Sequence, residues 1–280
     1  MSFVRTFINY IPEESFVHRL DPATKIIVMF TLSIQALATA EPISAAAIFF
    51  VSMLFFLAAK LPLNVLRKTL GLWIGTIVII WLAYSYSYSG VGTVLWRYSW
   101  IHFTDYSVLL ALTVMFRLFS VVTLAMLLYC STTQRDIITG LRKLGVPYLI
   151  TFVFALAIRT LSVLYDDYGR IREAQMARAL EMNKGSFPER VKKHVYLIAP
   201  LIVMALNRIE AMSNSIESRA FRIRFGHRTF YYVTHMRIVD YFISIFFIAE
   251  TSVFLVLRSA FGYFTVSWLL SIAPHFVLLI

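Results

Sequence analysis

Two arginines with the same small neighbours are the residues of this chain whose type and spacing best suit binding. Arg178 stands within Ala-Arg-Ala and Arg219 within Ser-Arg-Ala, and each precedes a glycine by seven residues, Gly185 and Gly226. Glycine commonly follows a helix C-terminus, so the pattern predicts an arginine about two turns before the end of each of two helices. The candidate docking residues are Ala177, Arg178, Ala179, Ser218, Arg219 and Ala220.

The helical neighbours of the two arginines differ. Arg178 has Glu181 three residues on, a spacing that favours a surface ion pair on a helix, whereas Arg219 has no carboxylate at three or four residues. Two interpretations stay open. The arginines stabilise helix ends through the helix dipole, by about 0.3–1 kcal/mol, or they are offered to a carboxylate on another protein, which a guanidinium can bind through two parallel hydrogen bonds.

The composition indicates a membrane protein. Of 280 residues, 59% are hydrophobic and 15% charged, against roughly a quarter charged in soluble domains. The one cysteine, Cys130, excludes a disulfide or a cysteine metal site within the chain. The formal charge of +11 suits nucleic acid or a membrane surface, and the location of the positive residues decides between them.

Apolar runs predict an all-α membrane protein with about six transmembrane helices. Residues 131–237 hold 17 of the 26 Lys and Arg residues, so we place them in the cytoplasm together with both termini. The apolar stretch 148–165 is long enough to suggest a span, but a crossing there would put the basic residues outside, so we reject it. The positive charge follows this topology, which disfavours nucleic-acid binding. The predicted parts are a membrane part at 1–130 with spans at about 26–40, 43–59, 69–88 and 107–130, a cytoplasmic domain of long helices at 131–237, and a second membrane part at 238–280 with spans at about 238–257 and 260–280. A polar and aromatic loop, 89–106, joins the third and fourth spans.

Two further groups of charged residues have more than one interpretation. Arg117 and Glu250 lie in the middle of predicted spans, where charges are costly and usually paired. They are a possible intramembrane pair, or each reaches backbone or water separately. The adjacent Asp166 and Asp167 resemble half of a metal pair, but without a second aspartate cluster we favour a local partnership with Arg170.

Catalytic and cofactor motifs are absent from the sequence. The six histidines are scattered, and no GxxxxGK[ST] phosphate-binding loop occurs. We therefore expect no cofactor, no metal site and no enzymatic activity.

Four segments resemble, in order, the transmembrane T component of energy-coupling factor transporters, the EcfT/CbiQ-like family. They are His-Arg-Leu-Asp-Pro-Ala-Thr-Lys at 18–25, Thr-Thr with an aspartate at 132–136, Leu-Gly-Val-Pro at 144–147, and the two arginine segments at 173–179 and 217–220. In the family, each arginine segment reads Ala-Arg-Gly or X-Arg-X. Here both signature glycines are alanine, Ala179 and Ala220.

The resemblance implies a non-catalytic coupling subunit in the cell membrane. Each X-Arg-X tip would enter a groove on one of two ABC-type ATPase subunits, and a small membrane S component would bind a vitamin or a transition-metal ion. Loss of either arginine is expected to abolish transport or ATPase retention, with the larger effect at Arg219. The alternative, a self-contained secondary transporter, predicts inverted repeats with helices broken at the membrane midplane, whereas the repeat found here lies in the basic segment.

Overall fold

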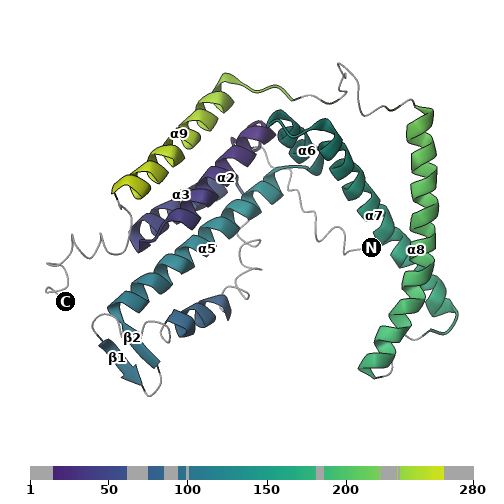
Figure 1. Cartoon of the computed structure of the whole chain (residues 1–280), viewed down its shortest axis with the longest axis horizontal. Helices are drawn as coiled ribbons and strands as arrows, with labels where there is room; N and C mark the ends of the chain where they lie inside the picture. The colour runs from purple at the N-terminus through teal and green to yellow at the C-terminus, as the bar shows by residue number, and fades with distance from the viewer. Residues whose placement is uncertain are drawn as a thin grey trace. The chain divides into compact units, whose positions relative to one another are not determined.

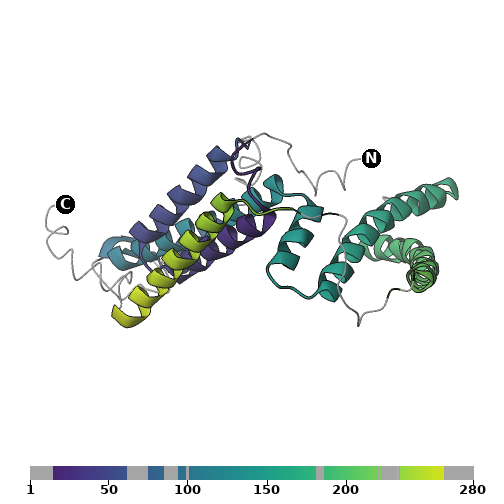
Figure 2. The same ribbon diagram turned by 90° about the horizontal axis from the view of Figure 1, so that it is seen from above.

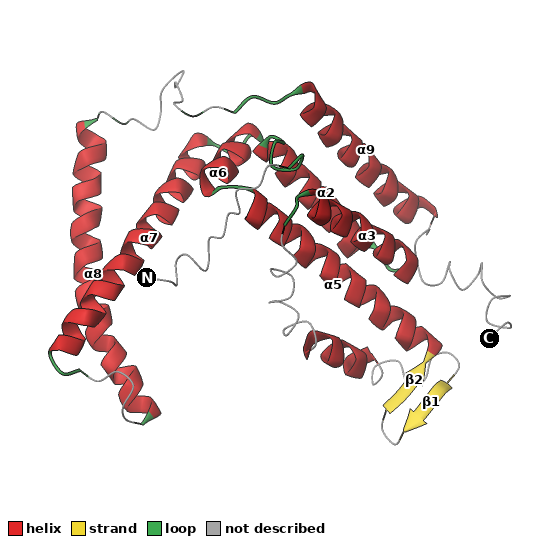
Figure 3. Cartoon of the chain, turned by 180° about the vertical axis from the view of Figure 1, so that it is seen from behind, coloured by secondary structure: helices red, strands yellow, loops and turns green. Residues whose placement is uncertain are grey.

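The computed structural model describes residues 15–61, 75–84, 94–98, 101–180, 186–219, 221, 232 and 234–261. All its long elements are helices, as expected for an all-α membrane protein (Figure 3). The labelled helices are α2 (Pro22–Ala38), α3 (Pro42–Ala58), α5 (Asp105–Ser131), α6 (Gln134–Lys143), α7 (Tyr148–Ala177), α8 (Phe187–Ser218) and α9 (Ile238–Phe261), and a further helix covers Gly75–Tyr84.

The chain forms two compact units. One runs from Gly145 to Val233 and contains α7 and α8, and the other contains the remaining helices. The first boundary lies at Gly145 rather than at the predicted Ser131, because α6 packs against α2. Gly140 makes that packing possible, since a Cβ added there would lie 3.1 Å from the Ala23 nitrogen.

The unit of membrane helices is a bundle with α2 at its centre. Helix α2 contacts α3, α5, α6 and α9, and the long axes of α2, α3, α5 and α9 run side by side (Figures 1 and 2). Its start is fixed by Asp21, whose side chain accepts a hydrogen bond from the Ala23 nitrogen, and by Pro22 in the first turn.

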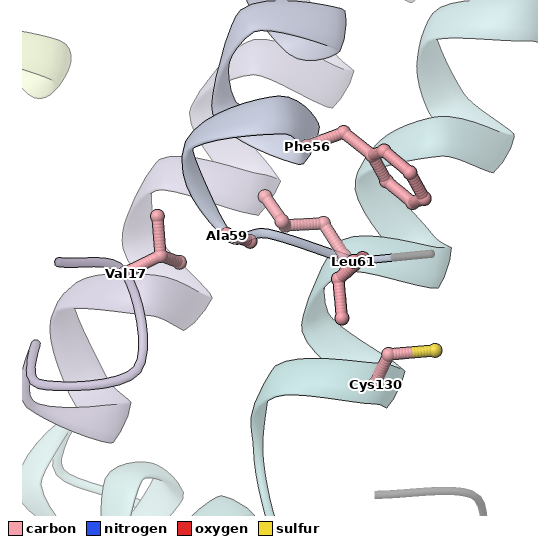
Figure 4. Packing of buried hydrophobic residues seen from close by; sticks show 6 residues of the cluster. Val17, Phe56, Ala59, Leu61 and Cys130 are labelled. Atoms are coloured by element: carbon pink, nitrogen blue, oxygen red, sulfur yellow. The ribbon is translucent and has the colours of Figure 1, made fainter. Parts of the chain in front are cut away.

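Apolar side chains fill the bundle from several helices. Val28 and Leu32 of α2 pack with Leu124 of α5 and Phe247 of α9. A second cluster closes one end of the bundle, where residues at the end of α3 meet Cys130 of α5 (Figure 4). Its buried members are Val17, Phe56, Ala59, Leu61, Leu127 and Cys130.

The predicted spans can be compared with four helices of this unit. Helices α2, α3, α5 and α9 begin within four residues of the predicted spans at 26–40, 43–59, 107–130 and 238–257. The third predicted span, 69–88, is described only at 75–84, and almost all of the sixth, 260–280, lies outside the described residues. By length and composition, the described helices able to cross a membrane are those at 107–131, 148–177, 192–218 and 238–260. Two of them are α7 and α8, so their cytoplasmic location stays a prediction.

A short β-hairpin lies where the sequence suggested a loop. Strands β1 (Val94–Tyr98) and β2 (Ile101–Thr104) are antiparallel, with Tyr98 opposite Ile101. The segment is rich in β-branched and aromatic residues, which favour strands. Each strand is too short to show a clear period of two, which explains why the loop was predicted instead.

Candidate docking tips on two crossing helices

Helix α7 ends at Arg178 in a hydrogen-bonded turn. Arg178 occupies the C-cap, the Ala179 nitrogen donates to the Met176 oxygen (3.0 Å), and the Leu180 nitrogen donates to the Gln175 oxygen (3.1 Å). These two bonds define a Schellman motif, which satisfies carbonyl groups that a helix end leaves free. Leu180 also packs against the buried residues of this unit, which is the hydrophobic contact typical of the motif.

The alanine that replaces the family glycine adopts the conformation that glycine favours. Ala179 has φ +63°, in the left-handed region, where a Cβ comes too close to the following carbonyl oxygen. Ala179 therefore holds with strain a backbone conformation that a glycine at this position would adopt freely.

Helix α8 also has an arginine at its C-cap, Arg219. The Phe221 nitrogen donates to the Ile216 oxygen (3.3 Å), which is the longer-range bond of a Schellman motif. Ala220 lies outside the described residues. The Phe221 ring stacks on Phe152 of α7 with centroids 4.7 Å apart, so the end of α8 is held against the first turns of α7.

These helix ends correct the predicted ones. The helices end at Ala177 and Ser218, so the arginines lie at the C-caps and not two turns before the end. The predicted helix-end glycines, Gly185 and Gly226, lie beyond these ends and outside the described residues. The helix is closed earlier because Ala179 takes the left-handed conformation, which sequence patterns assign to glycine or asparagine. Arg178 is therefore not followed by a helical turn, and Glu181, its predicted partner, lies outside the described residues.

Both arginines are available to a partner protein. Arg178 and Arg219 are exposed, as are the flanking Ala177, Ala179 and Ser218. Within the part of the chain that the structure describes, neither guanidinium forms an ion pair or a hydrogen bond. The small flanking side chains leave the backbone of the helix end open to close approach. The two tips thus present a cation on a helix end, in the same position twice.

A buried ion pair fixes the crossing of the two helices. Arg208 Nη2 of α8 lies 2.7 Å from Asp167 Oδ2 of α7, and the Asp167 side chain is 3% exposed. The distance is that of a close ion pair, although its angle is not that of a hydrogen bond. Asp167 therefore pairs with a residue of the other helix. The sequence had suggested Arg170 of the same helix instead. An uncompensated buried carboxylate would be costly, which makes Arg208 its required partner.

Helices α7 and α8 cross in opposite chain directions, and apolar contacts lie on both sides of the ion pair (Figure 1). Ile171 and Leu197 are buried together, and the stacked Phe152 and Phe221 lie toward the other end of α7. Pro200 lies inside α8 without ending it. The crossing and the two capped ends together determine where the arginines stand.

The predicted pair of intramembrane charges is not formed. Arg117 donates to the backbone oxygen of Thr39 in the turn between α2 and α3. The same turn buries Glu41, and burial raises the pKa of its carboxyl above the usual value. The partner of Arg117 is thus a backbone carbonyl and not Glu250. This is the second of the two interpretations of the sequence, in which Arg117 and Glu250 have separate partners.

Glu250 has its own partner on another helix. Its Oε2 accepts a hydrogen bond of 2.7 Å from Gln35 Nε2, which also donates to Thr251 Oγ1 (3.1 Å). Gln35 is 1% exposed, so this small network joins α2 to α9 inside the bundle. Sequence reasoning missed Gln35, whose only signal was an amide in an apolar run.

Comparison with known proteins gives a consistent result. Residues 13–231 match the family model CbiQ, described as Cobalt transport protein. The chain is similar to the energy-coupling factor transporter transmembrane protein EcfT of Acidaminococcus fermentans, at 25% identity over 78% of this chain and 83% of that protein. It is similarly related to EcfT of Bacillus selenitireducens (24% identity, 83% and 89% covered) and of Exiguobacterium sibiricum (27%, 76% and 84%).

Proposed function

Because this chain belongs to the CbiQ family of cobalt transport proteins, we propose that it is the coupling subunit of an ABC-type importer. It is a multi-pass membrane protein and a transmembrane component of the energy-coupling factor type. In the proposed complex, two ABC-type ATPase subunits bind the tips at Arg178 and Arg219. A small membrane S component binds a vitamin or a transition-metal ion and is reoriented by the motion of α7 and α8.

The repeated C-cap arginine is the observation that carries this proposal. Arg178 and Arg219 are the C-caps of two crossed helices, and at both ends the residue two positions after the arginine donates a backbone hydrogen bond to the third-last residue of the helix; both arginines are exposed and unpaired among the described residues. Two equivalent ATPase subunits require two equivalent sites, and a guanidinium fork recognises a carboxylate with defined geometry. Truncating one partner of a buried charge pair costs about 2–5 kcal/mol, enough to release a subunit.

The apolar surface of α7 and α8 supports the rest of the proposal. The unit buries little of its own apolar surface, and such surface marks a contact with membrane or protein. We assign it to the cytoplasmic face of the bilayer and to the S component, with both chain termini in the cytoplasm. The exposed apolar residues are Ile150, Val153, Phe154, Leu161, Ile198, Ile202, Val203, Leu206 and Ile209. Hydrolysis of ATP belongs to the partner subunits, and this chain carries out no chemical step.

Co-purification from membranes tests the proposal. The tagged wild-type chain is expected to retain two ATPase subunits and a small membrane protein in detergent. Arg178→Ala and Arg219→Ala are each expected to lose ATPase subunits while the chain keeps its yield and monodispersity. Arg172→Ala is the matched control, because Arg172 is an exposed arginine of α7 away from the tip.

The outcomes separate this proposal from the alternative. Full ATPase retention by both tip variants would remove the assigned role of the arginines. A chain that purifies without partners and carries out proton- or sodium-driven uptake in liposomes would instead be a secondary transporter.

A further inference from the structure

A cluster of buried charges at the start of α2 has no role in docking. Asp21 is 4% exposed, Asp240 2% and Lys25 9%, and all three lie within the unit of membrane helices together with Lys143. Lys25 also lies in the electrostatic field of Asp136 of α6, so charges of both signs meet at this point. Each member bonds to a different helix or to the segment next to one.

Asp21 is the residue at which these bonds meet. Its Oδ1 accepts from the Ala23 nitrogen (3.0 Å) and caps α2, while its Oδ2 forms an ion pair with Lys143 at the end of α6. Its backbone nitrogen donates to Asp240 Oδ1 in the first turn of α9 (3.1 Å). The other oxygen of Asp240 accepts from the Arg237 nitrogen, just before α9 (2.8 Å).

The bonding partners of Asp21 lie beside the two places where the chain passes between the membrane helices and the α7–α8 pair. The chain leaves the membrane helices after Leu144 and returns at Thr234. Lys143 is the last residue of α6 before the exit, and Arg237 is the last residue before α9 after the return. Both connections to the α7–α8 pair are therefore bonded, directly or through Asp240, to one residue at the start of α2.

Capping alone does not explain an aspartate at this position. Asparagine and serine cap helices about as well as aspartate, and neither supplies the second, charged oxygen that Lys143 uses. Lys25 reinforces the same point, because its Nζ donates to the backbone oxygens of His18 (3.2 Å) and Ser131 (3.0 Å) and so ties the end of α5 to α2.

We propose that Asp21 is a positioning residue that ties both connections of the α7–α8 pair to α2, so that displacement of this pair moves α2. The inference rests on the proposed coupling function and adds the route into the bundle. Helix α2 is the suitable receiver, because it contacts α3, α5, α6 and α9.

Spin-label distances in the assembled complex test this inference. Nitroxide labels at Phe30→Cys of α2 and Phe50→Cys of α3, two exposed positions, report movement of α2 inside the bundle. The buried Cys130 is replaced by alanine in this background. The distance is measured without nucleotide and with ATP and vanadate, and ATP hydrolysis is measured on the same preparations.

Two substitutions break the part of the tie that Asp21 makes through its side chain, the ion pair with Lys143 of α6, and one serves as the control. Asp21→Asn keeps the capping oxygen and removes the charge, and Lys143→Met removes the ammonium group and keeps the length. Each is expected to reduce the nucleotide-dependent shift of the distance to well below half of its wild-type size, because only the bond from the Asp21 nitrogen to Asp240 remains, while ATPase subunits stay bound and ATP hydrolysis continues. Arg135→Met, which replaces an exposed cation on the same helix α6, is expected to keep the shift.

Each outcome has one meaning. A shift that survives in both Asp21→Asn and Lys143→Met overturns the inference, and so does a wild-type complex in which α2 shows no shift. If the distance shift is lost in Asp21→Asn but kept in Lys143→Met, the ion pair with α6 is not the bond that transmits the motion. A lower thermal midpoint with an unchanged shift assigns the cluster to stability only. Failure of the wild-type chain to retain ATPase subunits refutes the proposed function instead.

Discussion

Replacing Ala179 with glycine is expected to stabilise the tip of α7, although glycine usually weakens helices. Ala179 has φ +63°, a conformation in which the Cβ of an L-residue is strained and glycine is not. The residue lies just past the helix, so glycine there interrupts no helical turn. The substitution also restores the Ala-Arg-Gly pattern of the family.

The magnitude follows from the conformation. The left-handed region costs an L-residue about 1 kcal/mol or somewhat more relative to glycine. Part of this gain is lost, because glycine makes the unfolded chain more flexible. A net gain of about 0.7 kcal/mol corresponds to a roughly threefold lower population of the open helix end.

Hydrogen exchange of the Leu180 amide is the direct measurement. This amide donates to the Gln175 oxygen at 3.1 Å and is released only when the turn opens. Exchange from the open end is expected to slow by roughly threefold in Ala179→Gly, after correction for intrinsic rates. Ala177→Gly is the matched control: Ala177 is the last helical residue, where glycine costs about 0.5–1 kcal/mol, so exchange should become faster.

Opposite signs for the same substitution two residues apart are the distinctive expectation. If Ala179→Gly accelerates exchange at Leu180 as Ala177→Gly does, the left-handed cap is not the state of the protein in solution. The reasoning about the signature glycine would then be wrong.

Two other perturbations test how each unit is held together. Asp167→Leu alone should lower stability by about 2–3 kcal/mol, since it leaves the half-buried Arg208 without a partner, and adding Arg208→Met should recover most of the loss in a thermal unfolding series in detergent; strictly additive losses would contradict the pairing. Gly140→Ala should destabilise the membrane unit by about 1–3 kcal/mol, because its Cβ would lie 3.1 Å from the Ala23 backbone. Gly169→Ala, on α7 with nothing within 4 Å, should instead stabilise by about 0.5–1 kcal/mol, and equal effects of the two alanines would show that the close approach of α6 to α2 is absent.

Features that depend on a long apolar run could be predicted from the sequence. A helix in a bilayer must satisfy its own backbone groups and present apolar side chains outward, so α2, α3, α5 and α9 follow from composition. Pro22 and Pro42 lie in the first turns of α2 and α3, a position that proline favours. The pattern cannot orient α7 and α8, because their apolar faces suit a bilayer and a protein partner equally well.

Features that depend on tertiary contacts could not be predicted. Asp167 and Arg208 are far apart in sequence, and nothing local distinguishes Arg208 from the nearer Arg170. Glu250 similarly finds Gln35 on another helix. The end of α7 was missed for a different reason: alanine is a good helix former, so its left-handed conformation at position 179 contradicts its propensity.

The C-cap position that the two arginines share leads to a prediction about their relative importance. Arg219 was expected to matter more because Glu181 would compete for Arg178 through helical spacing, but α7 ends at Ala177, before that spacing is complete, and Glu181 itself lies outside the described residues. With both arginines exposed at the C-cap, Arg178→Ala and Arg219→Ala should weaken ATPase binding equally, within about 0.5 kcal/mol or roughly a factor of two. Titration of each variant with the ATPase subunits gives the two dissociation constants. A much larger loss for Arg219→Ala would show that the two tips bind their partners differently despite the shared C-cap position.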